Sequence, residues 1–94
     1  MNASFLHVTH VKFKQAPKHL RRGGLIGFAS VELNGILRLN GIVVREVHGE
    51  FMVERPVRRD RRGQRHDVVE VAPEAWSTIA SGIIFWLQAT QVLR

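Results

Sequence analysis

The chain contains no cysteine among its 94 residues. This absence excludes a disulfide framework, a thiolate nucleophile and a cysteine-bound zinc site, and it fits a reducing compartment. Aspartate is nearly absent as well, since the chain has only Asp60 and Asp67, each close to several arginines. We expect the arginines to lower the pKa of both carboxyl groups, which makes the two aspartates poor general acids.

Other chemical sites are missing too. His7 and His10 are three residues apart on an expected strand and therefore point to opposite faces, while the other histidines lie in separate loops. The clustered glycines at residues 23–27 lack the ending of a phosphate-binding loop, and no serine lies on a tight turn. We therefore expect no enzymatic activity, no cofactor, no metal and no small-molecule substrate. The N-terminal residues lack the basic stretch and the long apolar run of a signal peptide.

Positive charge is abundant and concentrated in two segments. The chain has 14 Lys and Arg against 8 Asp and Glu, for a formal net charge of +6. The window 55–66 holds six arginines and one aspartate, and the window 18–22 holds one lysine and two arginines. Close arginines repel one another by about 1 kcal/mol per pair in water, so an anionic partner is expected. The candidate contacts are Arg58, Arg59, Arg61, Arg62, Arg65, Lys18, Arg21 and Arg22.

The pattern of apolar and turn residues predicts mostly strands before residue 72. Asn-Gly at 34–35 and His-Gly at 48–49 predict turns, and Asn-Gly at 40–41 predicts either a bulge or another turn. In the second strand we expect Ile26, Phe28 and Val31 to be the apolar members. The basic window is predicted to be a loop that turns at residues 62–63. The expected strands cover residues 5–13, 25–33, 36–47, 51–53 and 67–71.

A helix is predicted from Pro73 and Glu74 onward, because proline suits the first helical position and an acid suits the positive N-terminal end. No charged residue occurs from Ala75 to Leu93, which raises the possibility of a membrane span. Helical spacing argues for an amphipathic helix that covers a sheet instead. Its apolar face holds Trp76, Ile79, Ala80, Ile83, Ile84, Trp86 and Leu87.

Two apolar residues, Phe85 and Val92, fall on the polar face of this helix. They are either ordinary exposed residues or part of a subunit contact. Taken together, the elements predict a single α+β domain over residues 1–94. It is an antiparallel β-meander of about five strands followed by one C-terminal amphipathic helix.

The order of the motifs between residues 26 and 71 resembles that of the stage V sporulation protein G (SpoVG) family of bacterial septation regulators. Residues 29–34 read Ala-Ser-Val-Glu-Leu-Asn, residues 42–44 read Ile-Val-Val, and residues 51–56 read Phe-Met-Val-Glu-Arg-Pro. A basic loop with Gly63 and then Asp67-Val68 complete the set. From Pro56 to Asp67 the spacing is similar to that of the family without a gap.

The resemblance implies a SpoVG-like fold and a small cytoplasmic homodimer. It also implies binding of DNA, and in some members of RNA, to regulate gene expression in sporulation and septation. Arg58 and Arg59 lie where the family carries its basic pair, whereas Asp67 is interpreted as a structural residue that bonds loop amides or orients Arg59 or Arg65. Nucleic acid is the expected partner, and a membrane is not. The alternative is a non-enzymatic protein-interaction module whose basic loop docks an acidic partner protein.

Overall fold

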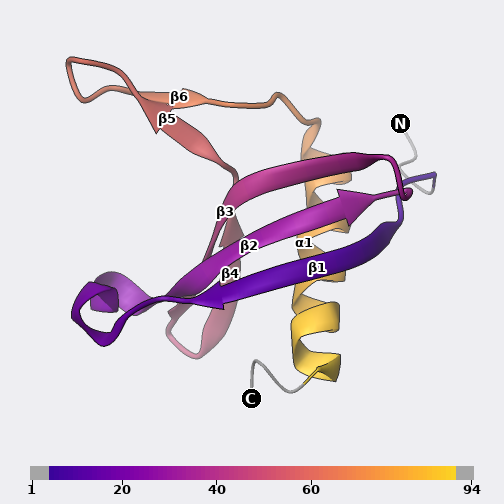
Figure 1. Ribbon diagram of the computed structural model, residues 1–94, viewed down its shortest axis with the longest axis horizontal. Coiled ribbons are helices and arrows are strands. Elements are labelled where there is room, and N and C mark those ends of the chain that lie inside the picture. Colours follow the sequence, from indigo (N-terminus) through magenta and orange to yellow (C-terminus); the bar gives the residue numbers. More distant parts are fainter. Residues whose placement is uncertain (1–4, 91–94) are drawn as a thin grey trace.

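The computed structural model describes residues 5–90 of the chain. A four-stranded antiparallel sheet has the order β1-β2-β3-β4, with β1 at Val8–Gln15, β2 at Leu25–Leu33, β3 at Leu37–Val47 and β4 at Glu50–Glu54. A separate two-stranded sheet pairs β5 (Val57–Arg59) with β6 (Arg65–Asp67), and helix α1 (Pro73–Ala89) follows (Figure 1). The predicted α+β class, the antiparallel meander and the C-terminal helix are confirmed.

Strand positions agree with the predictions except at the two ends of the meander. The strand predicted at 25–33 is confirmed at both ends, whereas the first strand begins three residues later than predicted, at Val8, and continues to Gln15. The strand predicted at 67–71 is wrong, because β6 covers Arg65–Asp67 and residues 68–72 have no strand structure. Val57 pairs with Asp67 in a local hairpin, which takes the last strand away from the main sheet.

Glycine-containing turns connect the strands as predicted. Asn34 and Gly35 both have positive φ, 54° and 70°, and the Ile36 amide donates to the Leu33 carbonyl over 3.1 Å. The pair at residues 40–41 is a bulge and not a turn, since Ala29 pairs with Ile42 while Val31 pairs with Leu39. Gly41 takes a φ of 76° there, which glycine tolerates without steric cost. The bulge lies where β3 bends strongly (Figure 1).

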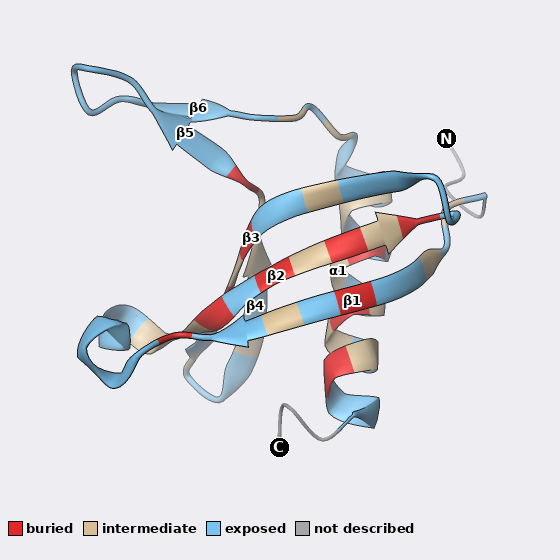
Figure 2. Cartoon of the chain, viewed as in Figure 1, coloured by how far each residue is buried: buried red, intermediate tan, exposed pale blue. Residues whose placement is uncertain are grey.

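Helix α1 covers one face of the four-stranded sheet, and the core lies between them (Figure 2). The predicted apolar helix face is confirmed, because Ile79, Ile83 and Leu87 are buried and both tryptophans pack against the core. A Cβ on Gly82 would lie 2.6 Å from Val8 Cγ2, so the small residue lets the helix approach β1 closely. The sheet side of the core consists of Val11, Ala29, Val31, Leu33, Ile42 and Val44.

The apolar members predicted for β2 do not all lie on one face of the sheet. Ala29, Val31 and Leu33 are buried, whereas Phe28 points to the opposite face and is 38% exposed. Strand side chains alternate between faces, so Phe28 and Val31 cannot both face the helix. On the helix, Phe85 is exposed as predicted, and Val92 lies outside the described residues.

Candidate nucleic-acid interface

The predicted basic loop is a β-hairpin that projects from the body of the protein (Figures 1 and 2). We call residues 57–67, which contain β5, the connecting turn and β6, the arm. Every residue of the arm is exposed. The five predicted arginines of this window therefore lie on one protruding hairpin, with their side chains accessible to a partner.

Three features hold the root of the arm in place. Pro56 is buried, and its carbonyl accepts a hydrogen bond of 3.2 Å from the Val68 amide, which closes the hairpin at its base. The Arg55 guanidinium carbon lies 5.7 Å from the centre of the Trp76 ring on α1, a cation–π contact. These contacts fix the direction in which the arm leaves the sheet.

The tip of the arm is organised by Asp60. Its backbone pairs with Gln64 and Gly63, with the Asp60 amide donating to the Gln64 carbonyl over 2.9 Å. Its Oδ1 accepts hydrogen bonds of 2.9 Å from the backbone amides of Arg62 and Gln64, and its Oδ2 lies 2.9 Å from Nε2 of His66. Aspartate commonly stabilises turns in this way, by bonding the backbone two or more residues further on.

The hydrogen bond from His66, together with those from the backbone amides of Gln64 and Arg62, lowers the pKa of Asp60 below its ordinary 3.8. The sequence predicted a lowered pKa, but attributed it to neighbouring arginines. The structural role predicted for Asp67 belongs to Asp60, because within residues 5–90 the Asp67 side chain has neither a hydrogen bond nor an ion pair. His66, interpreted from sequence as a solvated residue, is the partner of that carboxylate.

The arginines of the arm divide between its two faces and its tip. Arg58 lies opposite His66 in the register, and Arg59 lies opposite Arg65, so these two pairs project from different faces. Arg59 Nη1 donates to the Gly63 carbonyl over 3.1 Å. Within the described part of the chain, the other four guanidinium groups have no hydrogen bond or ion pair; they belong to Arg58, Arg61, Arg62 and Arg65.

A small hollow of about 280 Å³ lies on the arm and is lined by Arg58, His66, Asp67 and Val68. It brings one guanidinium group and an imidazole ring together with the carboxylate of Asp67. The acidic side chain that could compensate the charge of the tip, that of Asp60, already accepts three hydrogen bonds. The arm is therefore a strongly positive element with uncompensated donors.

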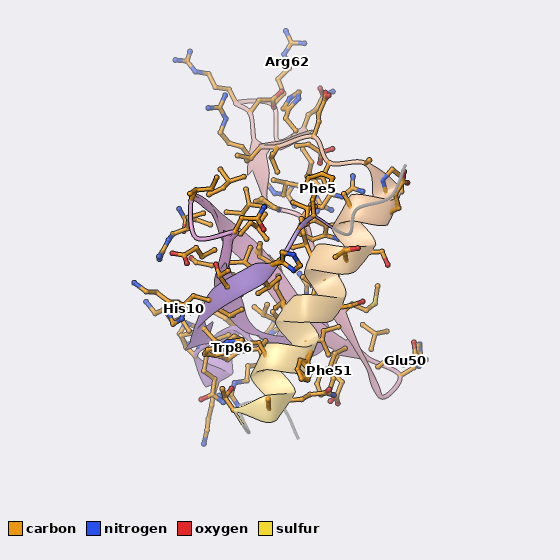
Figure 3. The ribbon with its side chains drawn as sticks, turned by 90° about the vertical axis from the view of Figure 1, so that its right-hand side faces the viewer. Phe5, His10, Glu50, Phe51, Arg62 and Trp86 are labelled. Carbon is orange, nitrogen blue, oxygen red and sulfur yellow. The ribbon has the colours of Figure 1, made fainter. Side chains whose placement is uncertain are left out.

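The second predicted basic cluster lies elsewhere. Lys18 and Arg22 belong to two short 3-10 helices, η1 at Lys18–Leu20 and η2 at Arg22–Gly24, in the connection between β1 and β2. Arg21 Nε donates to the Ala16 carbonyl over 2.9 Å and is thus partly engaged. Figure 1 shows this connection and the arm at different corners of the sheet, so the eight predicted residues do not form one patch. Figure 3 places Arg62 at the tip of the arm, away from the body of the protein.

Within residues 5–90, no cluster of three or more His, Asp or Glu could hold a metal ion. None of the helices described there has the length and apolar character that crossing a membrane requires. The chain matches no protein-family model and no curated protein, and the resemblance to the SpoVG family stays a prediction.

Proposed function

We propose that this protein binds nucleic acid through the arm, with arginine side chains contacting backbone phosphates. The observation that carries the proposal is the protruding hairpin with four guanidinium groups that have no partner within the described residues. Guanidinium groups bind phosphate oxygens in bidentate geometry, and such contacts dominate affinity for DNA and RNA. The contacts are independent of sequence, and any readout of bases would come from one or two arginines that reach guanine.

The resemblance to the SpoVG family supports a regulatory role for this binding in a bacterial cytoplasm, with DNA or RNA as the ligand. Arg58 and Arg59, the two positions that match the basic pair of that family, are both in the arm. The arm is the principal contact in this proposal, and Lys18, Arg21 and Arg22 contribute less because they occupy another corner of the sheet.

A homodimer belongs to the same proposal. Strands β1 and β4 are the two edges of the four-stranded sheet, and an unpaired edge is commonly protected by pairing with another chain. Size-exclusion chromatography with light scattering distinguishes the dimer from a species of 10.7 kDa, the mass of a single chain. Observation of that species alone would reject the dimer and leave the proposed binding unaffected.

The binding proposal is tested by fluorescence anisotropy with labelled DNA and RNA oligonucleotides, single-stranded and duplex, at several salt concentrations. We expect binding that weakens steeply as salt is added and that falls in the variant Arg58→Gln/Arg59→Gln. The matched control, Lys18→Gln/Arg22→Gln, removes the same charge from the other corner and should bind more nearly like the wild type. Absence of binding even at low salt would overturn the proposal. Binding to poly-glutamate in preference to every oligonucleotide would favour the protein-interaction module.

A further inference from the structure

The face of the main sheet that α1 does not cover carries an exposed aromatic ring beside basic residues. Lys14 of β1, Phe28 of β2 and Val43 of β3 are direct neighbours across the strands, and Lys12 is opposite Ser30. Neighbouring residues in register share one face of a sheet, and the helix packs on the other. Both lysines are exposed, and Phe28 keeps 38% of its surface accessible.

A hollow of about 260 Å³ lies on the open face, lined by Lys12, Phe13, Lys14, Phe28, Ala29, Ser30 and Gly41. This site was not predicted from the sequence, where Phe28 was expected only as an apolar member of the second strand. A sequence signal for it exists, since Lys12 and Lys14 alternate with the inward residues Val11 and Phe13.

Two acidic residues of this face are already paired. Glu54 lies 2.9 Å from Arg45 Nε, and Glu32 lies 3.6 Å from Arg38 Nη2. Within residues 5–90, Lys12 and Lys14 form neither an ion pair nor a side-chain hydrogen bond. The hollow therefore combines an accessible ring with two uncompensated positive charges, which complements a ligand that has a flat ring and a negative group.

The hollow adjoins the root of the arm. A Cβ built on Gly41 would lie 3.7 Å from the Cβ of Pro56, which directly precedes β5. A chain bound to the arginines of the arm can therefore continue onto the sheet face without crossing the helix.

We propose that the hollow binds an unpaired base of a single-stranded nucleic acid, stacked on the Phe28 ring, with the flanking phosphates on Lys12 and Lys14. The inference rests on the proposed function and names its substrate class. A duplex does not fit this site, because its bases are stacked on one another and present no free ring face. Aromatic side chains combined with basic residues are the common means by which proteins bind single strands.

Phe28→Ala is the central variant, and its effect is measured by anisotropy with single-stranded and duplex oligonucleotides at one salt concentration. We expect the affinity for single strands to fall by about 5- to 100-fold, and the affinity for duplex to change by less than about twofold. Phe85→Ala is the matched control, because Phe85 is an exposed phenylalanine of α1 with 68% of its surface accessible. It should bind both ligands like the wild type.

Two further substitutions separate stacking from folding and from simple apolar contact. Phe28→Trp keeps a stacking ring and should retain single-strand binding, with tryptophan fluorescence that is quenched as the oligonucleotide is added. Phe28→Leu keeps an apolar side chain without a ring and should lose affinity as Phe28→Ala does. Circular dichroism establishes that each variant is folded before binding is measured.

The possible results distinguish the two proposals. Unchanged single-strand affinity in Phe28→Ala, retained affinity in Phe28→Leu, or equal losses for single strand and duplex would overturn the base site and leave the arm proposal standing. If Phe28→Ala instead changes the oligomeric state, the face is a subunit contact and the base site is also rejected. A wild-type protein that binds no oligonucleotide at all overturns the proposed function itself.

Discussion

The salt dependence of binding provides a quantitative prediction for the tip of the arm. Arg61 and Arg62 lie in the turn of the hairpin, and their guanidinium groups have no partner within the described residues. The turn itself is held by Asp60 through backbone amides, and the variant Arg61→Gln/Arg62→Gln keeps those amides. We therefore expect this variant to lose phosphate contacts without losing the hairpin.

The magnitude follows from the number of phosphates that the arm can neutralise. If each of the five arm arginines neutralises one phosphate, the arm alone contributes about −4.5 to the slope of log affinity against log salt for duplex DNA and about −3.5 for a single strand. Between about 50 and 200 mM salt, these slopes correspond to losses of about 500-fold and about 130-fold. Without Arg61 and Arg62 the slopes become about −2.7 and −2.1, and the losses about 40-fold and about 18-fold.

The assay is equilibrium anisotropy at four or more salt concentrations for the wild type, for the arm variant and for Lys18→Gln/Arg22→Gln. The last variant has the same net charge as the arm variant but keeps all five arm arginines. An unchanged slope in the arm variant would refute the assignment of phosphate contacts to the tip. If the slope decreases equally in both variants, the overall charge of the protein, and not the arm, determines the salt dependence of binding.

Three predictions concern the fold that supports the arm and the sheet. The lowered pKa of Asp60 means that its turn contacts persist as the pH falls to 3.8 and are lost only at lower pH; amide chemical shifts in a pH titration should give a midpoint below that value. Gly27→Ala places a Cβ against the carbonyl oxygen of Lys14 and should destabilise the protein by about 1–3 kcal/mol in urea unfolding. Ile83→Ala leaves a cavity at a fully buried position and should lower the free energy of unfolding by about 2–5 kcal/mol. Phe85→Ala, on the exposed side of the same helix, should change the free energy of unfolding by less than about 0.5 kcal/mol.

Local sequence signals were sufficient to predict the types of the secondary-structure elements and most of their boundaries. Asn34 and Gly35 have the backbone conformation that the hairpin signal predicts, and α1 begins at Pro73, where proline suits the first turn. Helical periodicity identified the buried face around Ile79, Ile83 and Leu87. These features depend on residues within a few positions of one another, so the sequence alone contains them.

The errors arose where one element depends on a distant one. The face on which Phe28 lies is set by the pairing of β2 with both neighbours, and residues 26, 28 and 31 could not reveal it because the strand period is two. The strand predicted at 67–71 lies instead at Arg65–Asp67, because β6 pairs with β5 in a separate hairpin. Sequence also gave no indication that Asp60, and not Asp67, holds the basic turn.

The sequence by itself determined the α+β class, the helix and its buried face, the turns and the presence of two arginine-rich segments. Each of these follows from spacing, turn chemistry or charge over a short stretch of chain. Only the tertiary structure decided that one segment is a protruding arm, that the other lies at a different corner, and that Phe28 lines a hollow with Lys12 and Lys14 on an open face. Those placements depend on strand register and on the bulge at Gly41, which are set by pairing between residues far apart in the chain.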